Sequence, residues 1–252
     1  MKRDTSFGRK SGIALVLLLS LTSCVTSPFY DPAPKQPAAL RQHIVDRIAM
    51  IVTLPPQQAA KLMRQSSLNS SQPVSVSTAT PIGPNGMLLT AAHGVKGMSP
   101  NDVTLVYYSP TKHNRRGQAR VLWKDERADL ALIQVSFPTP SYYSWTPRDR
   151  TLPAGTRVIH GGLATGPKAQ VGQLLESLAG TGHFARPWVR HSLRLQPGDS
   201  GGPLLATSGE LIGINRAVGY VGVMDTSFFT ESQSTRPDPA KINSLIAGMS
   251  AH

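Results

Sequence analysis

The chain has 252 residues, a single cysteine and a formal net charge of +12 at pH 7, so it is long enough to bury a sizeable core without a disulfide framework. Its basic residues are scattered and form no stripe, which excludes nucleic-acid binding as the main function. The histidines outside the motifs described below lack metal-ligand spacing and no glycine loop resembles a phosphate cradle, so we expect no metal and no cofactor.

The N-terminus predicts an export signal. Four basic residues within positions 2–10 precede an apolar run at residues 13–21 that is too short to span a bilayer. The sequence LTSC then ends at Cys24, the sole cysteine, and resembles the bacterial lipobox. This resemblance implies a signal peptide over residues 1–23, lipidation of Cys24 and a lipid anchor in the bacterial cell envelope. By the same analogy Val25 implies the outer membrane, facing the periplasm; a plain secretory signal or an uncleaved anchor is the alternative.

Two segments are expected before the first strands. Residues 24–40 are rich in proline, which predicts an extended tether. Residues 41–72 are expected to be a helical extension. Apolar residues, among them Ile44, Ile48 and Ile51, recur there at mixed helical spacing, broken at Pro55 and Pro56.

From residue 73 onward, short apolar strands alternate with glycine and proline turns, which predicts a mostly β structure. His93 ends one such strand and is followed by a glycine, so its imidazole is expected at a strand end. Asp129 opens the apolar strand DLALIQV, where its carboxylate could accept a hydrogen bond from a histidine. Asp102 follows His93 too closely to return from a separate strand, and Asp125 lies in a charged run that is typical of a solvated loop.

The sequence GDSGGP at residues 198–203, hereafter the serine turn, predicts a nucleophile. Glycines on both sides of Asp199 and Ser200 free the backbone of Cβ clashes, so main-chain N–H groups can converge beside Ser200 Oγ, where an oxyanion would form. A serine hydroxyl is a weak nucleophile, and it needs a histidine base that is itself oriented by an acid. His93 and Asp129 are the best candidates for these roles.

The C-terminal region predicts a closing helix. Asp238 is a good N-cap, Pro239 suits the first helical position, and Gly248 suits the helix end.

The motifs TAAH at residues 90–93, DLAL at residues 129–132 and the serine turn resemble those of the trypsin-like serine peptidases, and they occur in the same order. The sequences flanking the serine, QPG before it and LIGIN after it, are most similar to the bacterial high-temperature-requirement type, without the PDZ module usual there. The resemblance extends from about residue 74 to the C-terminus.

This resemblance implies a chymotrypsin-like fold for residues 73–252: two six-stranded antiparallel β-barrels, with a short N-terminal helical segment and a C-terminal helix. It implies a catalytic triad of His93, Asp129 and Ser200, and an oxyanion hole formed by the N–H groups of Gly198 and Ser200. The chain would then be a membrane-anchored serine endopeptidase that acts on proteins or peptides. The alternative is a catalytically inactive lipoprotein that binds peptides or envelope proteins in the same cleft.

The substrate pocket is expected near Arg194, Gln196, Ile214, Asn215 and Arg216. No aspartate lies at the likely base of this pocket, which argues against a preference for Lys or Arg and favours a modest apolar side chain. An acidic side chain read by Arg194 or Arg216 is the second candidate.

Two positions depart from the family pattern. Digestive relatives pair the acid at Asp199 with a newly freed N-terminal amine, so Asp199 needs another partner here: backbone N–H groups, or an internal Arg or Lys. Arg216 replaces a small hydroxyl residue near the triad acid. Its guanidinium could compete with His93 for Asp129, or it could point into the cleft or solvent and touch nothing in the triad.

Overall fold

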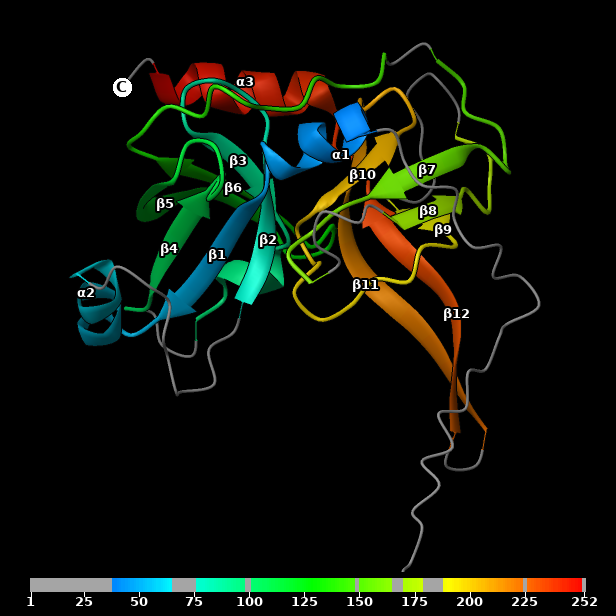
Figure 1. The fold of residues 1–252 in the computed structure, drawn as a ribbon, viewed down its shortest axis with the longest axis horizontal. Coiled ribbons are helices and arrows are strands. Elements are labelled where there is room, and N and C mark those ends of the chain that lie inside the picture. Colours follow the sequence, from blue (N-terminus) through cyan, green and yellow to red (C-terminus); the bar gives the residue numbers. More distant parts are fainter. Residues whose placement is uncertain are drawn as a thin grey trace, which may run out of the picture. The chain divides into compact units, whose positions relative to one another are not determined.

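The computed structural model of the chain describes residues 38–64, 76–97, 101–147, 150–164, 170–178, 188–223 and 226–250. The predicted signal peptide, the lipidation site Cys24 and nearly all of the tether lie outside these residues. None of the helices in the described part of the chain combines the length and the hydropathy of a membrane-spanning segment. The described residues form two β structures with three α-helices (Figure 1).

Six antiparallel strands close the first barrel in the order β1-β2-β3-β6-β5-β4 (Figure 1). These strands are β1 (Ala49–Leu54), β2 (Val76–Pro81), β3 (Met87–Thr90), β4 (Val103–Tyr108), β5 (Arg115–Asp125) and β6 (Leu130–Val135). The turn before β3 requires Gly86, which has φ 75° and on which a Cβ would overlap the carbonyl of Val135.

Strands β3 and β6 are buried on both faces, which explains why their sequences are continuously apolar. Leu88 and Ile133 pack inside the first barrel. Their neighbours Leu89 and Leu132 point to the opposite face and pack in a second cluster that also contains residues from the C-terminal half. Burial of each such side chain contributes about 1.5–3 kcal/mol to the free energy of unfolding. These two strands therefore hold in place the rim of the barrel, which is the end where the predicted site lies.

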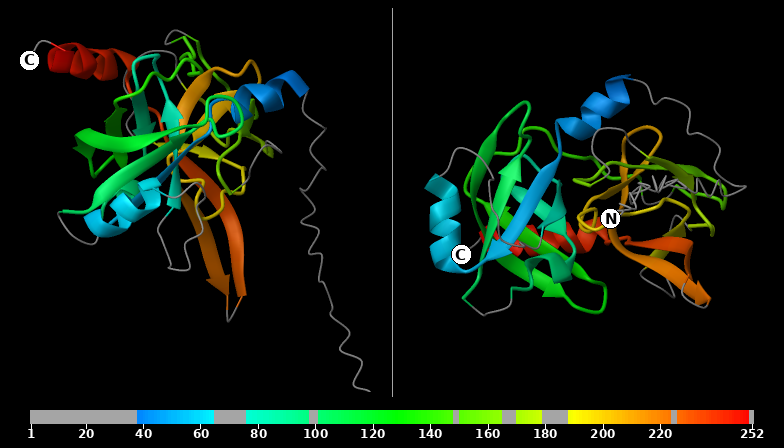
Figure 2. Two further views of the ribbon diagram at one scale, coloured as in Figure 1. Left: turned by 60° about the vertical axis from the view of Figure 1, so that its left-hand side comes forward. Right: turned by 60° about the horizontal axis from the view of Figure 1, so that its bottom comes forward.

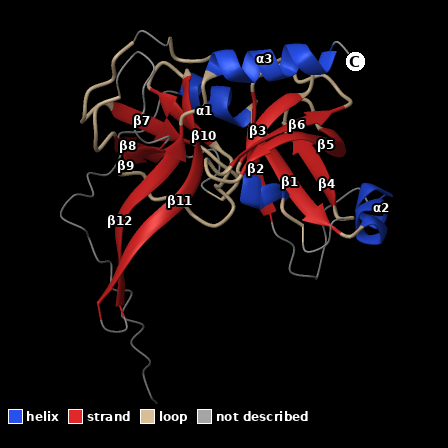
Figure 3. Ribbon diagram, turned by 180° about the vertical axis from the view of Figure 1, so that it is seen from behind, coloured by secondary structure: helices blue, strands red, loops and turns tan. Residues whose placement is uncertain are grey.

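The second sheet has six strands in the order β8-β7-β10-β11-β12-β9 (Figure 3). They are β7 (Arg157–His160), β8 (Gln170–Gln173), β9 (Trp188–His191), β10 (Pro203–Ala206), β11 (Leu211–Val223) and β12 (Thr226–Thr235). In the described residues its two edges meet around an isolated bridge between Leu174 and His191. The predicted chymotrypsin-like architecture is therefore confirmed, with the second barrel partly closed where a full barrel was expected.

The helical prediction for residues 41–72 needs correction. The structure has α1 (Ala38–Val45), then strand β1, then α2 (Pro56–Arg64). β1 pairs with both β2 and β4, so it completes the first barrel (Figure 2). The consecutive β-branched residues Ile51, Val52 and Thr53 favour a strand over a helix, and Pro55 ends it. The barrel thus begins at Ala49, well before residue 73.

An apolar cluster, hereafter the interface cluster, joins the first barrel, the second sheet and two helices. Its buried members are Ile44, Leu89, Leu130, Leu132, Tyr143, Ile159, Leu205, Leu211, Ile214 and Ile242. Helix α3 (Pro239–Ser250) adds Leu245 and Ile246, and the carboxylate of Asp238 caps its Ala240 N–H at 2.8 Å. The predicted closing helix is confirmed, although it continues past Gly248.

Candidate active site

His93 and Asp129 meet where strands β3 and β6 pair. His93 lies in the 3-10 helix η1 (Ala92–Val95) directly after β3, and Asp129 lies in the turn before β6. Its Oδ2 is 2.8 Å and its Oδ1 is 3.1 Å from His93 Nδ1. The Nδ1–H therefore donates to the carboxylate, which leaves Nε2 as a proton acceptor on a side chain that is 49% exposed.

The backbone of Asp129 aims this carboxylate. Its φ of 51° lies in the left-handed region, which costs on the order of 1 kcal/mol for a residue other than glycine. The conformation lets Oδ1 also accept the main-chain N–H of His93 at 3.0 Å. Burial raises the pKa of Asp129, but the hydrogen bonds from His93 and the charges of His93 and Arg216 hold that pKa below its ordinary value. The carboxyl group is thus kept ionised.

Asp125, the aspartate that the sequence places in a solvated loop, has a local role. Its Oδ1 accepts the N–H groups of Arg127 and Ala128, each at 3.0 Å. It therefore shapes the turn that presents Asp129, and its carboxylate serves the backbone there.

The serine turn extends from the second sheet and is hydrogen-bonded to β2 of the first barrel. Thr78 Oγ1 donates to the Gly198 carbonyl at 2.7 Å, and Thr78 N–H donates to the Ser200 carbonyl at 2.9 Å. Thr80 Oγ1 donates to the Gly201 carbonyl at 2.9 Å. A Cβ on Gly201, where φ is 82°, would overlap the Thr78 carbonyl and would lie 3.0 Å from the nitrogen of Ala91. The turn thus packs against the segment that leads to His93.

The N–H groups of Gly198 and Ser200 donate to no atom of the described residues. Both remain available for an oxyanion, while the carbonyls of the same residues are engaged with Thr78. Ser200 Oγ donates to the carbonyl of Arg216 at a long 3.5 Å. Within the described part of the chain, no hydrogen bond joins Oγ to His93 Nε2; such contacts commonly tighten only when substrate binds.

One partner of Asp199 is a histidine that the sequence analysis did not select. Asp199 and His160 are both fully buried, and His160 Nε2 lies 3.3 Å from Asp199 Oδ2, outside good hydrogen-bond alignment. Backbone N–H groups of Ala164 and Gln196 donate to the two carboxylate oxygens at 3.1 and 3.0 Å. Of the predicted partners, the backbone N–H groups are present, and His160 is a further partner that was not predicted.

Arg216 contacts the predicted triad acid. Its Nε lies 3.8 Å from Asp129 Oδ2, its Cζ lies 4.4 Å from the ring centre of Trp188, and its Nη1 donates to Gln233 Oε1 at 3.3 Å. The side chain is only 18% exposed. The alternative in which Arg216 points into the cleft or solvent and touches nothing in the predicted triad does not agree with this contact.

The structure divides the five predicted pocket residues. Arg194 and Gln196 are exposed, as a substrate contact requires. Ile214 and Asn215 are not: Ile214 is packed in the interface cluster and Asn215 is fully buried in polar contacts. Because β11 is covered on both faces at this point, neither side chain reaches the surface, and a role of these two residues in substrate binding stays a prediction.

Sequence reasoning missed Thr78, Thr80 and His160. The sequence VIHGG at residues 158–162 repeats the pattern seen around His93, an apolar strand followed by histidine and glycine, and this signal could have identified His160. No comparable local signal marks the threonines, whose partners lie about 120 residues away.

A surface hollow of about 700 Å³ lies elsewhere, on β5 and β6. Its lining includes Gln118, Arg120, Gln134 and Phe137. It contains none of the predicted site residues, so it does not bear on the chemistry at Ser200.

Known proteins provide an independent comparison. The trypsin-like peptidase domain family matches residues 77–214. A probable periplasmic serine endoprotease of the DegP-like type from Chlamydia pneumoniae is 30% identical over 151 residues, which cover 56% of this chain and 30% of that protein. The chain thus spans under a third of the length of such curated relatives.

Two solved structures share the fold. The active form of the Rv3671c protease from M. tuberculosis has a TM-score of 0.56 and 19% identity, over 85% of this chain and 87% of that one. The HtrA-type protease AlgW with a tripeptide has a TM-score of 0.58 and 18% identity, over 83% and 63% of the two chains. The predicted resemblance to the high-temperature-requirement type is confirmed by these relatives. The chain belongs to the trypsin-like peptidase domain family.

Proposed function

We propose that this chain is a serine endopeptidase that cleaves peptide bonds through an acyl-enzyme, with Ser200 as nucleophile, His93 as base and Asp129 as the orienting acid. The observation that carries the proposal is the 2.8 Å contact between His93 Nδ1 and Asp129 Oδ2. This contact lies beside the segment leading to His93, against which the serine turn packs. Relatives named as serine endoproteases support the same assignment.

In this mechanism His93 Nε2 accepts the proton of Ser200 as Oγ bonds to the substrate carbonyl carbon. The negative charge moves to the carbonyl oxygen, between the N–H groups of Gly198 and Ser200. The imidazolium then protonates the amide nitrogen, the C–N bond breaks and the amine leaves. Water attacks the acyl-enzyme and transfers a proton to Nε2, which returns it to Oγ as the acid product departs. Asp129 stays ionised and orients the ring throughout.

Labelling with a fluorophosphonate tests this proposal. The reagent phosphonylates an activated serine, so the unmodified protein should be labelled at Ser200, and Ser200→Ala and His93→Ala should not be labelled. Peptide hydrolysis should fall by about 10⁶-fold in Ser200→Ala. Ser208→Ala, which changes an exposed serine elsewhere, serves as the matched control and should label normally. A folded wild-type protein that never labels would contradict the peptidase proposal and leave the inactive lipoprotein as the alternative.

We further propose that the enzyme is tethered in the cell envelope through a lipid on Cys24. The sequence LTSC and relatives named as periplasmic support this location. Cells supplied with an alkyne-tagged fatty acid should incorporate the tag into the wild type, while Cys24→Ser should lose both the tag and its place in the outer-membrane fraction. Equal membrane recovery of the two proteins would count against the anchor.

For the substrate we propose a modest apolar side chain at the cleavage site. Arg216 is occupied by Asp129, Trp188 and Gln233, which weakens the case for its reading an acidic side chain. Cleavage of a peptide library with varied residues before the cut site tests this, and a consensus of Asp or Glu would favour the exposed Arg194 instead.

A further inference from the structure

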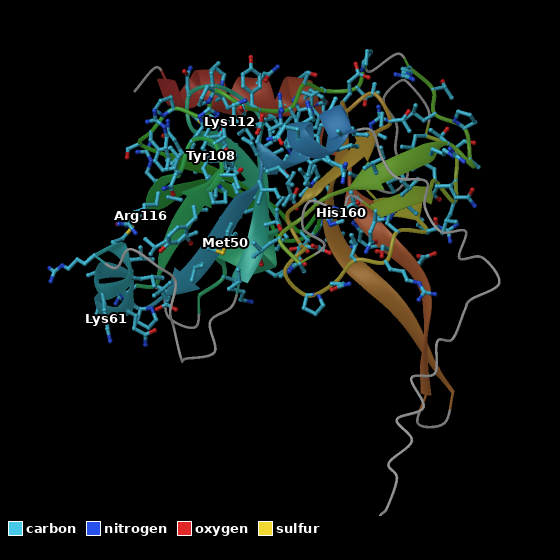
Figure 4. All side chains as sticks on the ribbon, viewed as in Figure 1. Met50, Lys61, Tyr108, Lys112, Arg116 and His160 are labelled. Atoms are coloured by element: carbon cyan, nitrogen blue, oxygen red, sulfur yellow. The ribbon has the colours of Figure 1, made fainter. Side chains whose placement is uncertain are left out.

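A buried polar network crosses the second sheet and ends at the acid beside Ser200. Its five members come from different segments: His191 on β9, Ser234 on β12, Asn215 on β11, His160 on β7 and Asp199 in the serine turn. All five are fully buried. Buried polar groups must find partners or destabilise the fold, so this set calls for an explanation. Figure 4 shows His160 at the central end of β7.

The contacts between these five residues form one continuous chain from His191 to Asp199. His191 Nε2 lies 2.8 Å from Ser234 Oγ, and Ser234 Oγ donates to Asn215 Oδ1 at 2.6 Å. Because the hydroxyl hydrogen is used there, Oγ accepts from His191. Asn215 Nδ2 lies 2.6 Å from His160 Nδ1, and His160 Nε2 lies 3.3 Å from Asp199 Oδ2.

The proton on His160 Nε2 follows from what surrounds the ring. Nδ1 faces both Asn215 Nδ2 and the Pro203 carbonyl, which is 3.1 Å away. If Nδ1 accepts from Asn215, the neutral ring carries its hydrogen on Nε2. If Nδ1 instead donates to Pro203, Nε2 must carry a hydrogen as well, because a bare Nε2 would direct its lone pair at a carboxylate. Both arrangements therefore place a hydrogen on Nε2, facing Asp199.

The space around this pair is closed. A Cβ on Gly162 would lie 2.7 Å from both Asp199 Oδ1 and His160 Cε1, and one on Gly202 would lie 3.1 Å from His160 Cε1. The N–H groups of Ala164 and Gln196 and the His160 ring all face the carboxylate and compensate its charge. Loss of the ring would therefore remove one of the groups that compensate this buried charge.

Asp199 controls the backbone that would hold the oxyanion. Its own N–H donates to the Gln196 carbonyl and its carbonyl accepts from Gly202 N–H, each at 2.9 Å. The flanking N–H groups of Gly198 and Ser200 are those left available. We propose that His160, held in place by Asn215, Ser234 and His191, is a positioning residue that keeps Asp199 seated and so preorganises the oxyanion hole. This role rests on the peptidase function proposed above.

His191, at the end of the buried polar network far from Asp199, does not change its protonation state in the physiological pH range. Burial, together with the nearby charge of His160, lowers the pKa of His191 to about 3. His191 therefore stays neutral and keeps donating to Ser234.

Variants of His160 test the positioning role. His160→Leu removes the donor toward Asp199 at similar volume, and we expect kcat and the rate of fluorophosphonate labelling to fall about 10- to 100-fold, with KM within about twofold, because an oxyanion hole acts in the transition state. His160→Gln offers an amide donor and should stay within about fivefold of wild type. Unchanged rates in His160→Leu, or equal damage by both substitutions, would overturn the proposal.

The matched control is His113→Leu. His113 Nε2 makes a 2.9 Å hydrogen bond to Ser141 and its ring stacks on Tyr108, in contacts remote from Asp199 in the chain. This variant should lose thermal stability without losing kcat. Asp199→Asn combined with His160→Leu should be no slower than the slower single variant if His160 acts through Asp199, whereas additive losses would contradict that path.

Nitrogen NMR of the unmodified protein separates this inference from the proposed function and needs no variant to fold. We expect His160 Nε2 to be protonated at neutral pH, and a ring protonated only on Nδ1 would overturn the inference. If the wild type fails to label with fluorophosphonate, the peptidase proposal fails, but the NMR result still decides how Asp199 is held.

Discussion

The first barrel and the second sheet both bury hydroxyl groups, but they differ in whether they also bury ionisable side chains. In the strands of the first barrel the buried polar residues are hydroxyls, including Thr78, Thr80 and Thr104, whose partners are backbone groups or another hydroxyl. The second sheet buries ionisable groups, the imidazoles of His160 and His191, and the carboxylate of Asp199 packs against it. Hydroxyls do not titrate in the physiological range, whereas imidazoles do.

This difference matches what each half contributes to the candidate site. The first barrel is a closed apolar structure that presents His93 and Asp129 on its rim, where they are partly exposed. The second sheet supports the serine turn through buried groups that water does not reach. We therefore expect changes at the rim to alter rate, changes in the first core to alter stability at every pH, and changes under the serine turn to affect both.

The largest expected effect is at the rim. Asp129→Asn keeps a residue type that tolerates the left-handed backbone, but the amide no longer enforces the Nδ1–H tautomer of His93. We expect kcat to fall about 10⁴-fold with a change in unfolding free energy within about 1 kcal/mol, as measured by peptide hydrolysis and urea denaturation. Asp125→Asn is the control and should keep most activity; similar losses in both would show that the turn, and not the acid, matters.

The apolar core of the first barrel should give the next largest effect. Ile133 is fully buried on β6, and Ile133→Ala should cost about 3 kcal/mol of unfolding free energy through lost burial and a cavity. Because no titrating group is involved, the loss should be the same at pH 7 and pH 5. A loss that changes between these two pH values would break the distinction between the two halves.

Thr78 connects the two halves, and its effect should be intermediate. Thr78→Val keeps the shape but removes the 2.7 Å donor to the Gly198 carbonyl and the acceptor for Leu163 N–H at 3.0 Å. We expect about 2 kcal/mol less stability and a roughly tenfold lower kcat. Thr104→Val, which removes a hydrogen bond to Thr53 within the first barrel, should reduce stability alone. Equal kcat values in the two variants would count against a role of Thr78 in seating the serine turn.

The smallest effect concerns pH. The pKa of His191 is about 3 in the fold and near 6.5 when unfolded, so between these values the unfolded chain binds the extra proton. Stability therefore falls as pH drops below about 6.5, by at most about 1.4 kcal/mol per pH unit from this group. Burial also lowers the pKa of His43, which acts in the same direction.

His191→Gln keeps a donor toward Ser234 but cannot titrate. Melting temperatures between pH 7 and pH 5 should decline less steeply in this variant than in the wild type. Identical slopes would mean that the pH sensitivity does not originate in the second sheet.

Much of this protein was predictable from local patterns in the sequence. The strands, the closing helix after Asp238 and the family motifs at His93, Asp129 and Ser200 depend on glycines, caps and apolar periodicity within a few residues. The strand β1 was misjudged for the same reason: a short apolar run suits either a helix or a strand until its pairing partners β2 and β4 are known.

The sequence by itself determined the family, the two-part β architecture and the residue types available for chemistry, because those signals are local. Only the tertiary structure decided that His160 faces Asp199, that Thr78 holds the serine turn, that Arg216 reaches Asp129, and that Asn215 is buried. These outcomes depend on contacts between segments far apart in the chain, and residue type alone does not specify which distant groups will share the same buried space.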